Sequence, residues 1–206
     1  MVNVANSSGD VIGVNMELQK LNVKFFVEQP DKVALTEFIE IFHSWIQATD
    51  GVYHDVADYS HMHAGPGIVL VANSANISID ESGARRGLLF SQKAPLTGSN
   101  QDKIRTVLRA ALDNCRKLEA EPALKGKLRF AANEAVLSVN DRLVGENSQL
   151  AFDALRGDVE AVAKQLFGGA NVTVARDAES RRQLNVQVKS GTGVDLAKAL
   201  ANISVN

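Results

Sequence analysis

The residues best suited to chemistry gather in one short segment, residues 54–63. It holds three of the four histidines, His54, His61 and His63, together with Asp55 and Asp58. Zinc and non-haem iron take imidazole and carboxylate ligands of this kind. On an extended backbone His61 and His63 would project from one face, and Asp58 could supply a third ligand. A water in an open position of that site would be acidified and could hydrolyse an ester or an amide.

The same segment offers an acid/base alternative that needs no metal. Asp55, Asp58 and His61 are the candidate catalytic residues, because a titratable group in a dry cleft can transfer protons. However, the sequence contains no His-Glu-x-x-His, no paired cysteines and no Gly-x-Ser-x-Gly. The sequence therefore favours no cofactor, and zinc or iron bound by Asp58, His61 and His63 is the alternative.

Two further patterns could bind an anion. Arg85-Arg86 and Arg181-Arg182 each lie beside an expected turn, and paired guanidinium groups can hold phosphate or carboxylate. The turn at residues 191–193 precedes an expected helix but lacks the lysine and spacing of a phosphate-binding loop. Residues 64–67, Ala-Gly-Pro-Gly, are expected to bend the chain before a strand, where no helix dipole would face a phosphate.

Composition and charge narrow the classes of partner. The chain has 206 residues and a net charge of −2, without the strong basic balance typical of a nucleic-acid binder. Residues 1–98 carry a net charge of −5 and residues 99–206 carry +3. This asymmetry has two explanations. The two halves carry solvated surfaces of opposite charge, which attract each other or a neighbouring subunit, or the second half carries a basic patch that binds an acidic partner. We expect no nucleic-acid partner.

The expected compartment is the cytoplasm. The one cysteine, Cys115, cannot form an internal disulfide, and its helical spacing predicts a buried thiol. The first ten residues lack the basic start and apolar core of a signal peptide. The uncharged run at residues 59–79 contains Pro66 and two glycines, so we expect no membrane span.

Hydrophobic periodicity predicts an α+β fold, with a mostly antiparallel sheet or sheets built from hairpins and backed by helices. Helices are expected over residues 32–49, from about 100 to Pro122, from about 147 to Gly168, and from about 193 onward. The strands are expected near residues 21–28, 52–59, 68–71, 77–79, 87–91, 128–132, 136–139, 172–174 and 184–188. This order indicates ββα pseudo-repeats. The alternative is that the similar order of elements does not arise from a true duplication.

Residues 1–15 are expected to be a flexible lead-in, and residues 16–206 one α+β unit. Two tightly packed halves, 16–121 and 127–206, are the alternative. The stretch DVADYSHMHAGPGIVLV, followed by Arg86-Gly87-Leu88-Leu89 and by LRFAANEAVLSVNDRL, resembles a group of uncharacterised bacterial proteins of similar length. The resemblance implies one integrated unit and assigns no activity, cofactor or site residue.

These observations favour a non-catalytic cytoplasmic protein that binds a protein partner or assembles with itself. The alternative is a metal-dependent or acid/base small-molecule enzyme or sensor centred on residues 54–63. A binder of anions or nucleotides through Arg85, Arg86 or the turn at Gly191 is the third hypothesis. Convergence of Asp58, His61 and His63 in a concave pocket would favour the enzyme.

Overall fold

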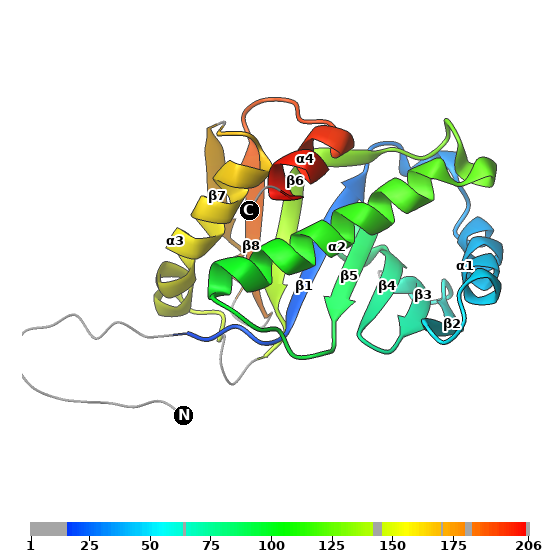
Figure 1. The fold of residues 1–206 in the computed structure, drawn as a ribbon, viewed down its shortest axis with the longest axis horizontal. Helices are drawn as coiled ribbons and strands as arrows, with labels where there is room; N and C mark the ends of the chain where they lie inside the picture. Colours follow the sequence, from blue (N-terminus) through cyan, green and yellow to red (C-terminus); the bar gives the residue numbers. More distant parts are fainter. Residues whose placement is uncertain (1–15, 64, 142–145, 170, 180–182, 205–206) are drawn as a thin grey trace, which may run out of the picture.

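The computed structural model describes residues 16–63, 65–141, 146–169, 171–179 and 183–204 (Figure 1). Within these ranges, eight antiparallel strands form one sheet in the order β2-β3-β4-β5-β1-β6-β8-β7, and four α-helices accompany it. The predicted α+β class is confirmed. The expected lead-in at residues 1–15 and the Arg181-Arg182 pair lie outside the described residues.

The strands are β1 (Leu21–Val27), β2 (Tyr53–Tyr59), β3 (Gly67–Ala72), β4 (Ala75–Asp80), β5 (Gly87–Gln92), β6 (Phe130–Val139), β7 (Val172–Arg176) and β8 (Leu184–Ser190). The helices are α1 (Glu37–Ala48), α2 (Asn100–Ala120), α3 (Gln149–Leu166) and α4 (Leu196–Ser204). Short 3-10 turns occur at Pro30–Lys32, Ser82–Ala84 and Pro122–Leu124.

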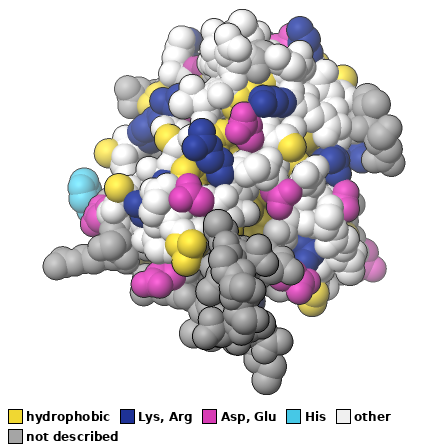
Figure 2. Space-filling model, turned by 90° about the vertical axis from the view of Figure 1, so that its left-hand side faces the viewer, with side chains coloured by type: hydrophobic (Ala, Val, Ile, Leu, Met, Phe, Trp, Pro, Cys, Tyr) yellow, Lys and Arg dark blue, Asp and Glu magenta, His cyan; other side chains and the backbone are white. Residues whose placement is uncertain are grey.

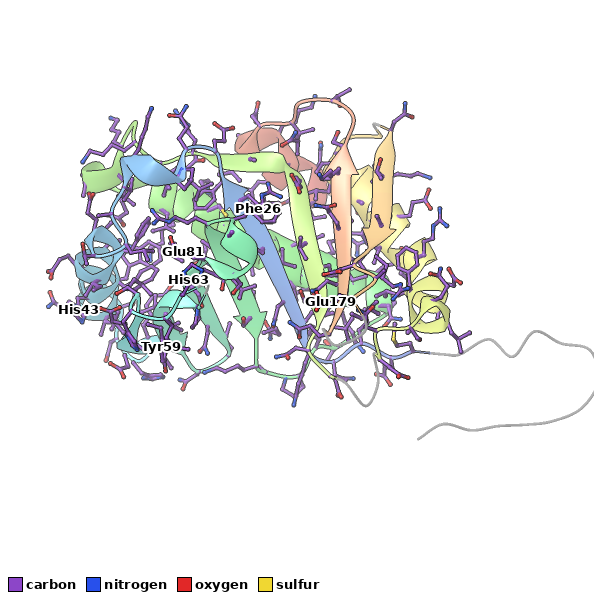
Figure 3. The ribbon with its side chains drawn as sticks, turned by 180° about the vertical axis from the view of Figure 1, so that it is seen from behind. Phe26, His43, Tyr59, His63, Glu81 and Glu179 are labelled. Carbon is purple, nitrogen blue, oxygen red and sulfur yellow. The ribbon has the colours of Figure 1, made fainter. Side chains whose placement is uncertain are left out.

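Three of the helices form a layer on one face of the sheet. α2 runs diagonally across β1 and β5, α3 lies over β7 and β8, and α4 packs between α2 and α3 above β6 (Figure 1). α1 packs against β2 and β3 at one end of the sheet. The view from behind in Figure 3 therefore shows the face that α2, α3 and α4 leave uncovered, which we call the helix-free face.

β1 shows how the sequence divides the two faces. Leu21, Val23 and Phe25 alternate toward the helices and enter the hydrophobic core. The residues between them, Asn22 and Lys24, point to the helix-free face. All seven residues of β1 are nevertheless buried, because the strand lies between β5 and β6 near the middle of the sheet.

α2 has the amphipathic pattern that the sequence predicts. The Ser99 hydroxyl accepts a hydrogen bond from the Asp102 backbone N–H at 3.2 Å, and the Asp102 carboxylate accepts one from the Ser99 backbone N–H at 3.0 Å, so the two residues form a capping box. Cys115 lies on the buried stripe, and burial raises the pKa of its thiol well above the ordinary value. Among the described helices, none combines the length and the apolar composition that crossing a membrane requires.

Two expected boundaries are wrong. The first helix begins at Glu37 rather than at residue 32, because the chain first makes the 3-10 turn at Pro30–Lys32. The strands expected at 128–132 and 136–139 form one strand, β6. Its pairing with β1 slips between Phe25 and Phe26, so an irregularity in one strand resembles a break in the sequence pattern. Four strands, β2 to β5, therefore lie between α1 and α2, one strand, β6, lies between α2 and α3, and two strands, β7 and β8, lie between α3 and α4.

The chain follows the same path twice. A strand near the centre of the sheet is followed by a helix, by outer strands that return to the centre, and by a second helix. The first pass is β1-α1-β2-β3-β4-β5-α2, and the second is β6-α3-β7-β8-α4. β1 and β6 lie side by side and antiparallel, so one sheet and one buried core extend on both sides of residues 121–127.

Residue 64 of the bend expected at residues 64–67 lies outside the described residues, and Gly67 is the first residue of β3. Its φ is +63°, which lies in the left-handed region that favours glycine. A Cβ atom at this position would lie 2.0 Å from the carbonyl oxygen of Ile79 on β4. Gly67 therefore allows the start of β3 to approach the neighbouring backbone closely.

We expect Gly67→Ala to lower the free energy of unfolding by about 3 kcal/mol or more, because the strain of a left-handed alanine adds to the collision with β4. Urea denaturation would measure the loss. Gly51→Ala is the matched control, since Gly51 has a φ of +69° and a Cβ atom there would have no neighbouring atom within 4 Å. It should cost only about 1 kcal/mol. Equal losses in the two variants would contradict the role of the close approach.

Candidate functional site

The structure places the segment at residues 54–63 at the end of the sheet and on the surface. Asp58 lies on the edge strand β2, which ends at Tyr59. His61 and His63 follow in a turn that is closed by a 2.9 Å hydrogen bond from the Met62 backbone N–H to the carbonyl of Tyr59. The extended backbone expected for the two histidines is therefore not formed. Both side chains are exposed, and Figure 3 shows His63 near Tyr59 at this end of the molecule.

The carboxylates of this segment accept hydrogen bonds from neighbouring backbone N–H groups. Asp58 accepts a hydrogen bond from the Ser60 backbone N–H at 2.8 Å, and Asp55 accepts one from Val56 at 2.8 Å. The hydroxyl and backbone N–H of Ser60, with the charge of His61, lower the pKa of Asp58. Over the described ranges, no three histidine, cysteine, aspartate or glutamate side chains gather as metal ligands would. Asp58 and His61 thus lie close together where β2 ends in a solvated turn.

The paired arginines at positions 85 and 86 are also engaged by the protein. Arg86 donates to Glu81 at 2.6 and 2.9 Å and to two backbone carbonyls of the segment at residues 30–33. Arg85 forms two hydrogen bonds with the Glu134 carboxylate, at 2.8 and 3.2 Å. These guanidinium groups link separate parts of the chain, and the expected anion site at this pair gains no support.

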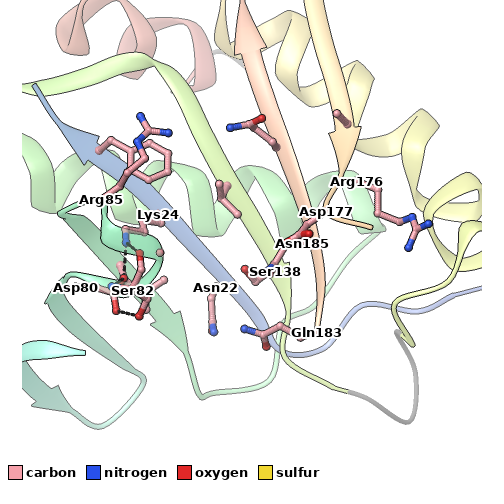
Figure 4. A pocket seen from close by; sticks show the side chains of 16 residues that line it. Asn22, Lys24, Asp80, Ser82, Arg85, Ser138, Arg176, Asp177, Gln183 and Asn185 are labelled. Carbon is pink, nitrogen blue, oxygen red and sulfur yellow. Dashed lines mark hydrogen bonds and ion pairs between the residues drawn. The ribbon is translucent and has the colours of Figure 1, made fainter. Parts of the chain in front are cut away.

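A hollow of about 510 Å³ opens on the helix-free face (Figure 4). This volume is within the usual range for small-molecule sites. The hollow extends over β1, β6 and β8 and reaches the 3-10 turn after β4. The lining residues that matter most for its chemistry are Asn22, Lys24, Arg85, Ser138, Asn185 and Gln187.

One side of the hollow is formed by a buried ion pair. The Lys24 ammonium lies 2.5 Å from the carboxylate of Asp80 and donates to the carbonyl of Ser82 at 2.9 Å. Asp80 is 2% exposed, and it also accepts a 2.6 Å hydrogen bond from the Ser82 hydroxyl. Burial lowers the pKa of Lys24, and the hydrogen bond and charge of Asp80 oppose that effect. At the edge of the hollow, the positive charge of Lys24 is therefore neutralised by the negative charge of Asp80.

A second charged group lies beside it. The Arg85 guanidinium stacks on the ring of Phe26, 3.6 Å from its centroid, while it binds Glu134. Glu134 also accepts a 2.6 Å hydrogen bond from Gln187. Although partial burial raises the pKa of Glu134, the hydrogen bond and charge of Arg85, with the charge of Lys189, hold it below its usual value. This carboxylate is shared by side chains from several elements.

Asparagine and serine alternate in a line across five neighbouring strands. Asn76 on β4 is opposite Ser91 on β5, and Ser91 is opposite Asn22 on β1. Asn22 is opposite Ser138 on β6, which is opposite Asn185 on β8. We call these five residues the amide–hydroxyl row. Because paired residues share a face of a sheet, the whole row lies on the helix-free face.

The row is incompletely hydrogen-bonded. The buried side-chain oxygen atoms without a partner, among the described residues, are Oδ1 of Asn22, Asn76 and Asn185. Each buried acceptor left unpaired costs about 1–3 kcal/mol. Three such atoms in one line, two of them in residues that line the hollow, identify the row as the candidate site.

Sequence reasoning missed this site. The alternation along β1 predicts Asn22 and Lys24 simply as the polar side of a strand. The available signal is the presence of asparagine within strands, where it is uncommon, at positions 22, 76 and 185. The register that aligns these positions depends on pairing between distant strands, and periodicity along a single strand does not contain it.

We expect Asp80→Asn to lower the free energy of unfolding by about 3–5 kcal/mol at pH 7, because it leaves the buried ammonium of Lys24 without its counter-charge. The pKa of Lys24 is then further below its ordinary 10.5, so the unfolded chain binds this proton more tightly than the folded chain. Stability relative to the wild-type protein should recover as the pH rises toward that value. Denaturant unfolding from pH 7 to 10 would measure both effects.

The double variant Lys24→Met/Asp80→Asn is the control for this prediction. It removes both charges, so most of the lost stability should return. If the double variant is as unstable as Asp80→Asn at pH 7, the unpaired ammonium is not the cause of the loss.

Comparison with known proteins assigns no function. No protein-family model matches the chain, and no curated protein matches it in sequence. The contacts, burial and charges of the helix-free face therefore carry the functional inference.

Proposed function

We propose that this protein acts by binding rather than by catalysis, and that the hollow on the helix-free face is its binding site. The observation that carries the proposal is a hollow of about 510 Å³ lined by polar side chains, on the face that the helix layer leaves uncovered. Of these side chains, Asn22, Lys24 and Ser138 are each 7% exposed. Buried polar groups around a cavity of this size are typical of small-molecule recognition.

The weaker alternative is the metal-dependent or acid/base enzyme or sensor at residues 54–63. Its candidates, Asp55, Asp58, His61 and His63, are all exposed and do not line the hollow. General acid/base catalysis gains from a site that excludes water, and this edge strand and turn do not provide one. We therefore rank the enzyme below the binding protein.

The proposal also includes a cytoplasmic location and no nucleic-acid partner. The buried thiol of Cys115 is compatible with a reducing compartment. Figure 2 shows the end of the molecule at β7 and α3, where basic and acidic side chains are intermixed. This mixture gives little support to the basic-patch hypothesis for the second half of the chain.

We expect Val136→Phe to abolish ligand binding, because Val136 lines the hollow and the larger ring would fill it. The probe is a mixed panel of sugars, nucleosides, amino acids and carboxylic acids, applied in a thermal-shift assay. A compound present at about 100 times its Kd should raise the Tm of the wild-type protein by roughly 5–10 °C. The variant should show no such rise.

Val71→Phe is the matched control. Val71 is a half-buried valine on the same face that does not line the hollow, so this variant should keep the response. A panel without any active compound, or one whose hits are equally strong in Val136→Phe, would refute the hollow as the binding site.

A second proposal is that the chain associates with a second copy through the end of the sheet at β2. β2 is an edge strand, and Val52, Tyr59 and Met62 around it are 50%, 40% and 48% exposed. Exposed apolar side chains beside an unpaired strand edge can join two chains. A different protein partner at the same edge is the alternative outcome.

If β2 joins two copies, the mass measured by light scattering should rise with protein concentration, and Met62→Lys should lower the apparent association. Leu150→Lys is the matched control, because Leu150 is an apolar side chain on α3 that is 61% exposed and far from β2 in the chain. A constant monomer mass at every concentration would rule out self-association. An equal effect of both variants would rule out β2.

A further inference from the structure

Two hydrogen-bond acceptors in the hollow lack donors. Oδ1 of Asn22 and Oδ1 of Asn185 are buried and unpaired within the described part of the chain, and both residues line the hollow. Asn22 is 7% exposed, so its amide is built into the sheet and is not a surface group. Ser138 lies between the two asparagines on β6 and offers a hydroxyl group. The amide groups of the two asparagines and the hydroxyl group between them border the hollow and suit a ligand that forms several hydrogen bonds.

The cationic side chains of the lining are already engaged by the protein. Lys24 is paired with Asp80, and Arg85 is paired with Glu134. Arg176 donates to the side-chain oxygen of Asn147 at 2.9 Å. An anionic ligand that recruited Lys24 would have to separate a buried ion pair, which is costly, and one that recruited Arg85 would compete with Glu134. The contact of Arg176 is to a neutral amide, so the argument against an anion rests on Lys24 and Arg85. An uncharged ligand leaves them intact.

The shape of the lining further restricts the ligand. Asn22 and Asn185 are two strand spacings apart, about 10 Å. Leu89 and Val136, which are opposite Lys24 on its two neighbouring strands, provide apolar contact near the row. Phe26 is buried, with Arg85 stacked on its ring, so it offers no free surface on which a nucleobase could stack. Hydroxyl groups separated by C–H surfaces match this arrangement.

We propose that the hollow binds an uncharged, hydroxyl-rich small molecule, a sugar or polyol, whose hydroxyl groups form hydrogen bonds with the side-chain amide groups of Asn22 and Asn185. The Ser138 hydroxyl forms a third polar contact, and the side chains of Leu89 and Val136 contact the carbon skeleton. This assignment rests on the binding function proposed above and names its ligand class.

The test is a titration of the isotope-labelled full chain, followed by NMR of the side-chain amide groups. The neutral probes are glucose, maltose and myo-inositol, and the comparison probes are glucose 6-phosphate and adenosine. We expect saturable shifts of the Asn22 and Asn185 amide signals with at least one neutral probe. The phosphorylated sugar should bind more weakly than glucose, because it introduces a charge among pairs that are already neutralised.

Asn22→Leu separates a binding role from a structural one. It should weaken binding of the neutral probe by about tenfold or more, since one hydrogen bond is lost. The Tm without ligand should stay the same or rise, because an apolar group replaces an unpaired buried oxygen. Asn76→Leu is the matched control: Asn76 belongs to the same row and has the same unpaired oxygen but does not line the hollow. Its Tm should respond similarly, and its affinity should be unchanged.

The outcomes distinguish this assignment from the proposed function. Shifts at Asn22 and Asn185 with glucose 6-phosphate or adenosine, but with no neutral probe, would overturn the ligand class and leave the binding site in place. A Tm that falls in Asn22→Leu while affinity is unchanged would make the amide structural and overturn the assignment. If no probe shifts the Asn22 and Asn185 signals in the titration, the assignment of the ligand class is overturned as well. Silence of the broader panel in the thermal-shift assay would overturn the binding function itself.

Discussion

A sheet with helices on only one face must satisfy the polar groups of its other face without them. In this protein β1 is the critical strand, because all of its residues are buried although its alternate side chains point away from α2. Lys24 can be buried only because Asp80, from β4, neutralises it at 2.5 Å. Arg85, which follows the turn after β4 and is exposed, pairs with the less exposed Glu134 on β6. The organisation of the helix-free face follows from these two pairs.

The amide–hydroxyl row is the part of that face whose hydrogen bonds the fold leaves incomplete. Its serines and asparagines are aligned by the pairing of β4, β5, β1, β6 and β8, yet three amide oxygens remain without donors among the described residues. Natural cores seldom retain unpaired buried acceptors unless something compensates for them. The adjacent ion pairs add a further effect, because they remove net charge from the hollow while keeping its polarity. A protein that sacrifices stability in this way for recognition follows a common pattern.

The predictable parts of the fold are those encoded by local periodicity. The alternation of Leu21, Val23 and Phe25 correctly predicts a strand with one face in the core, and the stripe through Cys115 correctly predicts the buried side of α2. The pattern divides β6 in two because residues 132–134 interrupt the alternation where its register with β1 slips. It places the start of α1 too early because Pro30 can open a 3-10 turn as readily as a helix.

The candidate site is less predictable, for a different physical reason. The histidines at positions 54, 61 and 63 attract notice because they are close in sequence, but an edge strand and a turn leave them solvated. Asn22, Ser138 and Asn185 are far apart in sequence and become neighbours only through strand pairing. Residue type suggests what a group can do. The partner strands determine whether it is buried, paired or left incomplete.

The repeated path of the chain has a consequence for its synthesis on the ribosome. β1 is made early, but its two neighbours in the sheet, β5 and β6, are made much later, the second of them only after α2. Until Phe130–Val139 has emerged, one edge of β1 has no strand to cover it, and α2 has only part of the sheet on which to pack. Nascent chains with such a bare inner edge are prone to pairing with the wrong partner. Correct maturation of this protein therefore depends on the order in which its halves leave the exit tunnel.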